Sequence, residues 1–344
     1  MDEQLLLVSE LATGVKRSDF QLTLRTPLEI QSNELYDLRV GDRHWIAKRF
    51  LKADELAVAP VREHETLKLL AHLDIAPQPV FFDPAVAPIV VYQYLDGKMW
   101  DRRPPNATQL ERLAKLWITL HALPTADLWV SRGWERTAEE TLAFLEQSFA
   151  KYSAWAAPHF PPGQAAIAVC LPLLDQAAQI FAHITAARPL LCFCRADPRF
   201  ANVIERPDGR LAYVDWEDSG LRDPARDLAD LLTHPNQEDL LTTSAWQAFL
   251  QPYWAERLEL DATMPERMHL YLAVFPLFWL AVCFRIGVGL AEQGKLAGWQ
   301  INGFPANARL QRYLARALAW PQTDFSEELA RVDALQFFPT KDTK

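Results

Sequence analysis

The residues best suited to chemistry gather in one stretch of the chain, between positions 190 and 232. Asp197 follows an apolar run in a segment with loop character, and Asn202 and Asp215 come after it. Carboxylate and amide oxygens are hard ligands of the kind that hold Mg²⁺ beside phosphate groups. A carboxylate next to such a site is placed to accept the proton of a hydroxyl group. The stretch therefore favours metal-assisted phosphate chemistry.

A β-hairpin is the element that must bring two of these side chains together. Val203–Arg206 and Arg210–Asp215 are strand-like runs on either side of the turn residues Asp208-Gly209. With the turn centred there, Asn202 and Asp215 are cross-strand partners, whose Cα atoms lie about 4.5–5.5 Å apart. We therefore expect both side chains to reach one ion.

Two further carboxylates complete the predicted site. Glu217, two residues after Asp215, is expected to supply or orient another ligand, and Asp197 is expected to project over the same site from its loop. The alternative is structural, because single Asp and Asn residues in loops commonly cap turns. The joint pattern is more specific than any of its members.

The first hundred residues predict a small antiparallel sheet with one helix. The runs 35–40 and 43–50 predict a hairpin joined at Gly41-Asp42, and 80–83 and 89–95 predict two more strands. A helix is predicted over 57–73, with Glu63 on the same face as Leu67 and Leu70, which must turn toward the sheet.

The rest of the chain predicts mostly helices. Apolar residues at helical spacing occur over 107–123, 136–152, 165–186, 244–259, 265–292 and 306–320. We therefore predict an α+β fold with two lobes. Residues 1–97 form the N-terminal lobe, and residues 98–344 form a larger, mainly helical lobe that carries the hairpin.

Composition narrows the classes of protein. Half of the residues are hydrophobic and 23% are charged, which excludes intrinsic disorder, and the net charge of −9 makes a nucleic-acid partner unexpected. The first ten residues lack the basic start of a signal peptide. The apolar stretch Leu270–Phe284 is shorter than the about 20 residues that span a bilayer. We expect a cytoplasmic protein without a membrane span, with its four cysteines reduced, as a monomer or homodimer.

Three motifs resemble the aminoglycoside phosphotransferase and choline kinase-like family, which also includes thiamine and ethanolamine kinases. Arg195-Ala196-Asp197, followed by Asn202, stands where the family has a His-x-Asp and an Asn. Asp215-Trp216-Glu217 is similar to its metal-binding segment, in a form closer to the choline and thiamine kinase branch. The run from Gly220 to Ala229 resembles its Gly-x-x-Asp-Pro-x-x-Asp-Leu-Ala segment.

The resemblance implies a two-lobed, protein-kinase-like fold and an enzyme that uses ATP and Mg²⁺. It implies that Asp197 is the catalytic residue, with Arg195 in place of the family's bracing histidine. It further implies that Asn202, Asp215 and Glu217 hold the metal. Asp227 is expected either to hold the catalytic loop or to lie in the first turns of a helix that Asp223 caps.

In the N-terminal lobe, the resemblance implies a nucleotide site. Lys48 matches the strand lysine that contacts ATP phosphates, and Glu63 matches its helix partner, with Glu65 as the alternative. The remaining expected nucleotide contacts are Ser32 and Asn33 in a phosphate-covering turn, and Gln93, Tyr94 and Leu95 in a hinge under the adenine.

The acceptor is expected to be a hydroxyl of a small metabolite such as choline or another amino alcohol, thiamine or an aminoglycoside. Tyr271, Trp279 and Trp299 could face its cationic group through cation–π attraction, or could simply form core. Four acids, Glu256, Glu259, Asp261 and Glu266, could instead meet an amino sugar. Because Arg195 replaces the histidine and a Gly-x-Gly pattern is missing, an inactive nucleotide-binding pseudokinase is the alternative function.

Overall fold

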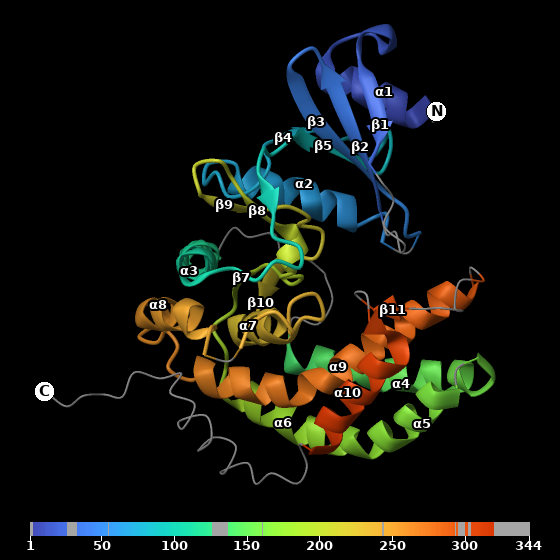
Figure 1. The fold of residues 1–344 in the computed structure, drawn as a ribbon, viewed down its shortest axis with the longest axis vertical. Helices are drawn as coiled ribbons and strands as arrows, with labels where there is room; N and C mark the ends of the chain where they lie inside the picture. The colour runs from blue at the N-terminus through green and yellow to red at the C-terminus, as the bar shows by residue number, and fades with distance from the viewer. Residues whose placement is uncertain are drawn as a thin grey trace, which may run out of the picture. The chain divides into compact units, whose positions relative to one another are not determined.

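The structure is a computed structural model that describes residues 3–25, 33–53, 55–125, 137–159, 161–242, 244–292, 294, 300–301 and 304–319. The chain divides into two compact units (Figure 1). The first unit contains Met1–Asp101 and Phe200–Gly220, and the second contains Arg102–Leu128, Gly133–Arg199 and Leu221–Lys344. The hairpin with the predicted metal ligands thus belongs to the first unit, and Asp197 belongs to the second.

A five-stranded antiparallel sheet forms the centre of the first unit, in the order β1-β2-β3-β5-β4. Its strands are β1 (Gln21–Leu24), β2 (Asn33–Val40), β3 (Arg43–Phe50), β4 (Pro79–Phe81) and β5 (Ile89–Gln93). The predicted hairpin is β2 and β3, which pair from Val40 and Arg43 outward. Gly41 takes a φ of +56° in its two-residue turn, a conformation that glycine adopts without strain. This pairing places Lys48 near the end of β3, at the centre of the sheet.

The described residues of this unit form two α-helices, whereas the sequence predicted one. Helix α2 (Ala59–Leu70) is the predicted helix, and Leu67 and Leu70 are fully buried on one of its faces. The additional helix is α1 (Glu3–Thr13), whose Leu5 and Val8 join the core of the sheet. Their three-residue spacing places both side chains on one face of the helix.

The second hairpin differs from its predicted register by one residue. Strands β8 (Val203–Glu205) and β9 (Leu211–Tyr213) pair Val203 with Tyr213, and they form a small sheet with β6 (Lys98–Met99). The turn has three residues, 207–209, because Arg206 and Arg210 pair and Gly209 adopts a φ of +80°. Asn202 is therefore not the cross-strand partner of Asp215.

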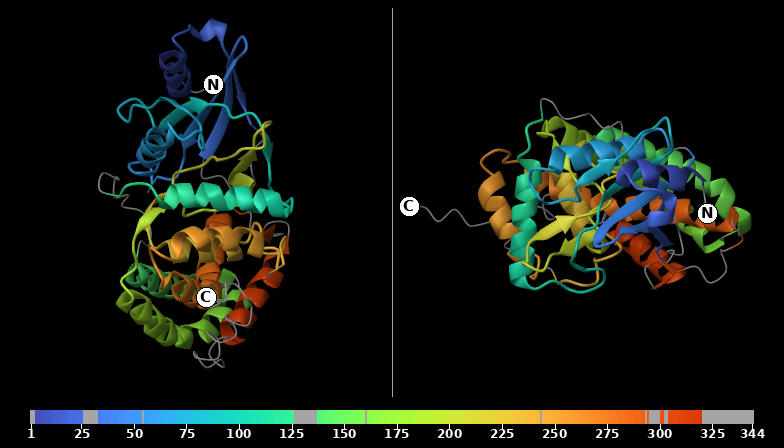
Figure 2. Two further views of the ribbon diagram at one scale, coloured as in Figure 1. Left: turned by 90° about the vertical axis from the view of Figure 1, so that its left-hand side faces the viewer. Right: turned by 90° about the horizontal axis from the view of Figure 1, so that it is seen from above.

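The second unit is mainly helical (Figures 1 and 2). Its α-helices are α3 (Ala107–His121), α4 (Ala138–His159), α5 (Pro161–Cys170), α6 (Leu174–Ala186), α7 (Pro224–Thr233), α8 (Gln247–Arg257), α9 (Met264–Glu292) and α10 (Ala306–Ala319). Strand β7 (Cys192–Cys194), the predicted buried strand before Asp197, pairs with β10 (Gly220–Arg222). All four cysteines are buried and free, as predicted.

Two helical stretches are longer than the apolar run considered in the sequence. Ile167–Ala186 and Met264–Glu292 are long and apolar enough to cross a membrane, by length and composition alone. The core helix of a soluble protein passes the same test, and α9 packs against α4, α7 and α10. The apolar stretch Leu270–Phe284 is thus part of a longer helix, because α9 continues on both sides of it and through Pro276, and most of its residues in this stretch are buried.

Candidate active site

A cluster of one buried lysine and three carboxylates, of which Asp215 is partly exposed, lies in the first unit. The Lys48 ammonium is 3.2 Å from Glu63 Oε2 and 2.9 Å from Glu217 Oε2, and it also contacts Asp215 Oδ1. The Lys48 side chain is only 2% exposed. The structure therefore brings together three residues predicted for the metal and nucleotide sites, around the predicted lysine. Glu65, the alternative partner, instead pairs with Lys68.

The electrostatics of this cluster keep the lysine charged. Burial alone would lower the pKa of Lys48, but Asp215, Glu217 and Glu63 raise it well above its usual value. Burial also raises the pKa of Glu217 to about 7, and the nearby charge of Lys48 only partly offsets this effect. Near neutral pH, Glu217 is therefore balanced between its acid and carboxylate forms.

Helix α2 fixes the segment that carries the carboxylates. Glu63 Oε2 accepts a hydrogen bond of 2.7 Å from the backbone N–H of Trp216, between the two predicted metal ligands. Arg62 donates to the Glu217 carbonyl oxygen at 2.6 Å, and the hydroxyls of Thr66 and Ser219 lie 2.9 Å apart. Neighbouring residues of one helix thus hold three backbone or side-chain groups of the segment 216–219.

Asn202 reaches Asp215 despite the corrected register. The Asn202 amide nitrogen donates to Asp215 Oδ2 at 3.4 Å, from the end of the 3₁₀ turn Phe200–Asn202. Asp215 lies beyond the end of β9 with a φ of +66°, a conformation uncommon for residues other than glycine. This departure from strand geometry turns the Asp215 side chain toward both Asn202 and Lys48.

The donor set fits a hard divalent cation. Oxygens of Glu63, Asp215 and Glu217 all lie within 4.8 Å of one another, and half a turn of the Asn202 amide would present its oxygen beside them. Oxygen-only ligands of this kind suit Mg²⁺.

The other predicted nucleotide residues are partly described. Asn33 begins β2, and its amide donates to Glu217 Oε2 at 2.7 Å, so it touches the carboxylate cluster. Ser32 lies outside the described residues. Gln93 ends β5, and Tyr94 follows it with its ring stacked on His44, at a centroid distance of 3.9 Å. Leu95 lies in the segment that follows the strand.

In the second unit, two basic side chains hold the carboxylate of Asp197. His234 Nε2 lies 3.2 Å from Oδ1, and Arg199 Nε lies 3.0 Å from Oδ2. Burial alone would raise the pKa of Asp197, but Arg199, His234 and Arg195 together lower it far below its usual value. Asp197 is therefore ionised at any working pH. Sequence reasoning missed both partners, and only the closeness of Arg199 in the sequence could have suggested one.

Asp227 holds the loop that carries Asp197. Its two carboxylate oxygens accept hydrogen bonds from the backbone N–H groups of Arg195, at 2.9 Å, and Ala196, at 2.8 Å. His121 Nε2 lies 3.5 Å from the same carboxylate, and His121 Nδ1 lies 2.7 Å from the Tyr253 hydroxyl. The Arg195 side chain is fully buried. Asp227 also lies in the first turn of α7, which Asp223 caps, so the structure agrees with both expectations for this residue.

Replacing Asp227 by asparagine is expected to lower the free energy of unfolding by about 2–3 kcal/mol, because an amide keeps only one oxygen for the two buried N–H donors. Urea unfolding at pH 7 measures this. Asp230→Asn is the matched control on the same helix. Burial raises the pKa of Asp230 well above its usual value, so the fold disfavours its charged form, and replacement by a neutral amide should cost less than about 1 kcal/mol. Equal costs would contradict this role of Asp227.

The aromatic residues predicted for the acceptor separate into different environments. Trp279 packs edge-on against His234, at a centroid distance of 4.8 Å, and is therefore next to the partner of Asp197. Tyr271 is only 1% exposed and packs against Phe181 and Phe275, the environment expected under the alternative that it forms core. Trp299 lies outside the described residues.

Two of the four acids suggested for an amino sugar are engaged elsewhere. Asp261 pairs with Arg267 at 2.7 Å, and Glu266 lies 2.9 Å from His183.

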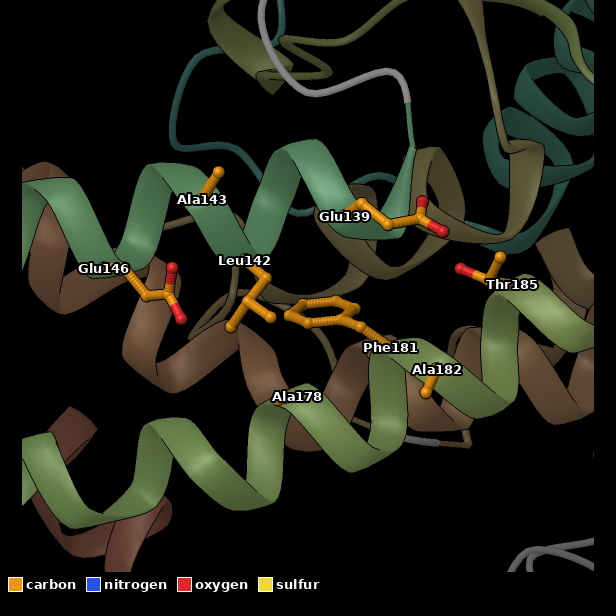
Figure 3. Close-up of a pocket in the computed structure, with 8 residues that line it drawn as sticks. All are labelled: Glu139, Leu142, Ala143, Glu146, Ala178, Phe181, Ala182 and Thr185. Atoms are coloured by element: carbon orange, nitrogen blue, oxygen red, sulfur yellow. The ribbon is translucent and has the colours of Figure 1, made fainter.

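A cavity of about 450 Å³ lies between α4 and α6 (Figure 3). It is lined by Glu139, Leu142, Ala143, Glu146, Ala178, Phe181, Ala182 and Thr185. None of these eight is a predicted site residue.

Comparisons with known proteins agree with this geometry. Residues 24–271 match the family model described as "Phosphotransferase enzyme family". A search of curated proteins found no match. Among solved structures, the choline kinase LicA from Streptococcus pneumoniae is 22% identical with a TM-score of 0.60, covering 87% of this chain and 94% of its own.

Two further structures extend the comparison. A choline kinase from Cryptosporidium parvum is 12% identical with a TM-score of 0.66, covering 96% of this chain and 98% of its own. The aminoglycoside phosphotransferase APH(2")-IIa, in a complex with streptomycin and ATP, is 12% identical with a TM-score of 0.61, covering 95% and 98%. At these identities the likeness shows the fold, and it confirms the predicted α+β, protein-kinase-like class.

Proposed function

Because the chain belongs to the phosphotransferase enzyme family, we propose that it is a kinase that transfers the γ-phosphate of ATP to a hydroxyl of a small metabolite. The observation that carries this proposal is the contact of one buried lysine with the carboxylates of Glu63, Asp215 and Glu217. A lysine paired with a helix glutamate, next to acidic metal ligands, is the arrangement that kinases use to hold phosphates. We also propose that residues 1–97 form the ATP-binding lobe and that residues 98–344 form the catalytic and substrate-binding lobe.

The first unit would hold the nucleotide and the metal. Asn202, Asp215 and Glu217 would hold Mg²⁺, which when bound neutralises the charge of the phosphates. Lys48 steadies the phosphates, and Glu63 keeps the lysine directed toward them. Most of the rate enhancement would come from this positioning and from charge neutralisation, since the protein itself forms no bond to the phosphoryl group.

Asp197 would act on the acceptor. Its carboxylate is ionised and held from both oxygens, so it is suited to accept a hydrogen bond from the acceptor hydroxyl and to orient it. Because its pKa is held so low, orientation is a larger part of its role than storage of the proton.

We further propose that the acceptor is a cationic alcohol of the choline type. Trp279 lies next to the partner of Asp197, and an indole face attracts an ammonium group by about 0.5–2 kcal/mol. The ionised Asp197 adds negative charge nearby. Choline kinases are among the proteins of similar fold.

The decisive experiment measures Mg²⁺-dependent ADP formation with choline, ethanolamine, thiamine and an aminoglycoside. Turnover that depends on one acceptor supports the kinase. The alternative, an inactive nucleotide-binding protein, is favoured by Arg195 at the position of the family histidine. It predicts a thermal shift with ATP and Mg²⁺ but no turnover with any acceptor. A protein that does not bind nucleotide would contradict both functions.

Binding of Mg²⁺ should depend on pH through Glu217. With a pKa raised to about 7, this group is mostly protonated below pH 7 and must lose its proton to become a ligand. The Kd for Mg²⁺, measured by calorimetry with ADP present, should rise by up to about tenfold for each pH unit below 7. Above pH 7 the Kd should become constant. Glu217→Gln should bind more weakly at pH 8 and remove this dependence. A dependence retained in the variant would assign it to another group.

A further inference from the structure

The turn after α7 places a histidine of defined protonation against Asp197. The backbone N–H of Asn236 lies 3.1 Å from His234 Nδ1, while His234 Nε2 lies 3.2 Å from Asp197 Oδ1. A backbone N–H can only donate, so Nδ1 is an acceptor and the proton of the neutral ring is on Nε2. His234 therefore donates a hydrogen bond to the Asp197 carboxylate.

Packing fixes the direction of this donor. The His234 side chain is only 8% exposed, and its ring meets Trp279 at an interplanar angle of 79°. The Trp279 indole N–H in turn donates to Thr233 Oγ1 at 3.3 Å, at the end of the helix that precedes His234. With one ring nitrogen bound to a backbone amide and the ring edge against an indole, rotation of the imidazole would break both contacts.

The same turn is tied to the loop of Asp197 and to the last described helix. Gln237 is fully buried and donates to the carbonyl oxygens of Pro198, at 3.0 Å, and Leu231, at 2.9 Å. On its other side, Arg309 of α10 donates to the Pro235 carbonyl at 3.3 Å. Glu238 in this turn accepts from Arg309, from Tyr313 at 3.0 Å and from Arg316 at 2.8 Å.

We propose that His234 is a positioning residue for phosphoryl transfer, which orients the Asp197 carboxylate through a hydrogen bond from Nε2. This inference rests on the proposed function. His234 does not relay the proton of the acceptor hydroxyl. The lone pair of its neutral ring, on Nδ1, already accepts a hydrogen bond from the Asn236 amide. Arg199 forms an ion pair with the other oxygen, but its side chain is 37% exposed, whereas that of His234 is 8% exposed, so His234 is the better fixed of the two partners.

The test compares His234→Ala with His234→Gln, whose amide nitrogen can replace Nε2. With choline and Mg-ATP, the alanine variant should lose about 10–100-fold in kcat with its KM for ATP within twofold, because a hydrogen bond to a charged group is lost. The glutamine variant should recover to within about fivefold of the wild type. His183→Gln is the matched control, since His183 also pairs with a carboxylate but is 58% exposed. Equal losses in both His234 variants, or no loss in either, would overturn the proposal.

A second measurement separates this proposal from the kinase function. In the full-length protein, ¹⁵N NMR of the histidine rings should show His234 as the Nε2–H tautomer, and Asp197→Asn should shift its ring signals. If the wild type does not phosphorylate choline, the proposal for the acceptor is wrong. The spectrum still shows whether His234 Nε2 donates a hydrogen bond to Asp197. An Nδ1–H tautomer, or signals unchanged by Asp197→Asn, would overturn the role of His234.

Discussion

Replacing Asp197 by asparagine is expected to reduce kcat by about 100–10,000-fold, because the acceptor hydroxyl loses the group that orients it and accepts its proton. Asparagine has nearly the same shape, but it has only one oxygen and no charge. The electrostatic attraction of the carboxylate to Arg199 and His234 is therefore lost. The affinity for Mg-ATP should change less than threefold. ADP formation with choline and titration with a fluorescent ATP analogue measure the two quantities.

Asp175→Asn is the control for this variant, since Asp175 is an exposed residue in the first turn of α6. It should retain the activity of the wild type. If the Asp197→Asn variant has the wild-type melting temperature and the wild-type kcat, Asp197 has no role in the reaction. A loss of nucleotide binding as large as the loss of kcat would instead indicate that the substitution had disturbed the fold.

The second large effect is expected from Lys48→Met. Methionine removes an ammonium that contacts the carboxylates of Glu63, Asp215 and Glu217, of which Glu63 and Glu217 are buried, and leaving buried charges without their partner costs about 3–5 kcal/mol. Activity should fall by about 100–1,000-fold, as when one preorganised donor to a developing charge is lost. Guanidinium unfolding and steady-state kinetics measure the two effects.

The pH dependence of this variant distinguishes electrostatics from packing. Without Lys48, the pKa of Glu217, which burial already raises to about 7, loses the charge that lowers it and rises further, so the folded state binds more protons. Stability must then increase as the pH is lowered from 8 toward 5, which is the opposite sign to a carboxylate with a depressed pKa. Lys68→Met, which removes an exposed lysine paired with Glu65, should leave stability within about 0.5 kcal/mol at every pH. A loss in Lys48→Met that does not vary with pH would point to packing alone.

Much of the site could be predicted because its parts are short and local. Glu63 was preferred to Glu65 from the helical face that it shares with Leu67 and Leu70, and the structure places Glu63 against Lys48. The elements of the small sheet follow from alternating strand formers around Gly41-Asp42. In each case the pattern that predicts the contact lies within one helix or one hairpin.

The failures share a different cause. The register of β8 and β9 depends on whether Gly209 lies inside a two-residue or a three-residue turn, and the turn sequence is compatible with both. The meeting of Asn202 and Asp215 then depends on the unusual φ of Asp215, which no residue pattern indicates. His234 lies 37 positions beyond Asp197, and only the folded path of the chain brings them together.

The three contacts of α2 with the segment 216–219 have a consequence for regulation. Glu63 serves both Lys48 and the backbone of Trp216, so a displacement of the helix would release the lysine and the metal-binding segment in the same movement. An effector that binds more tightly to the protein with α2 displaced would therefore lower the activity without touching the reacting groups. Control of α2 would act as a single switch on two components of the machinery, without competing with either substrate.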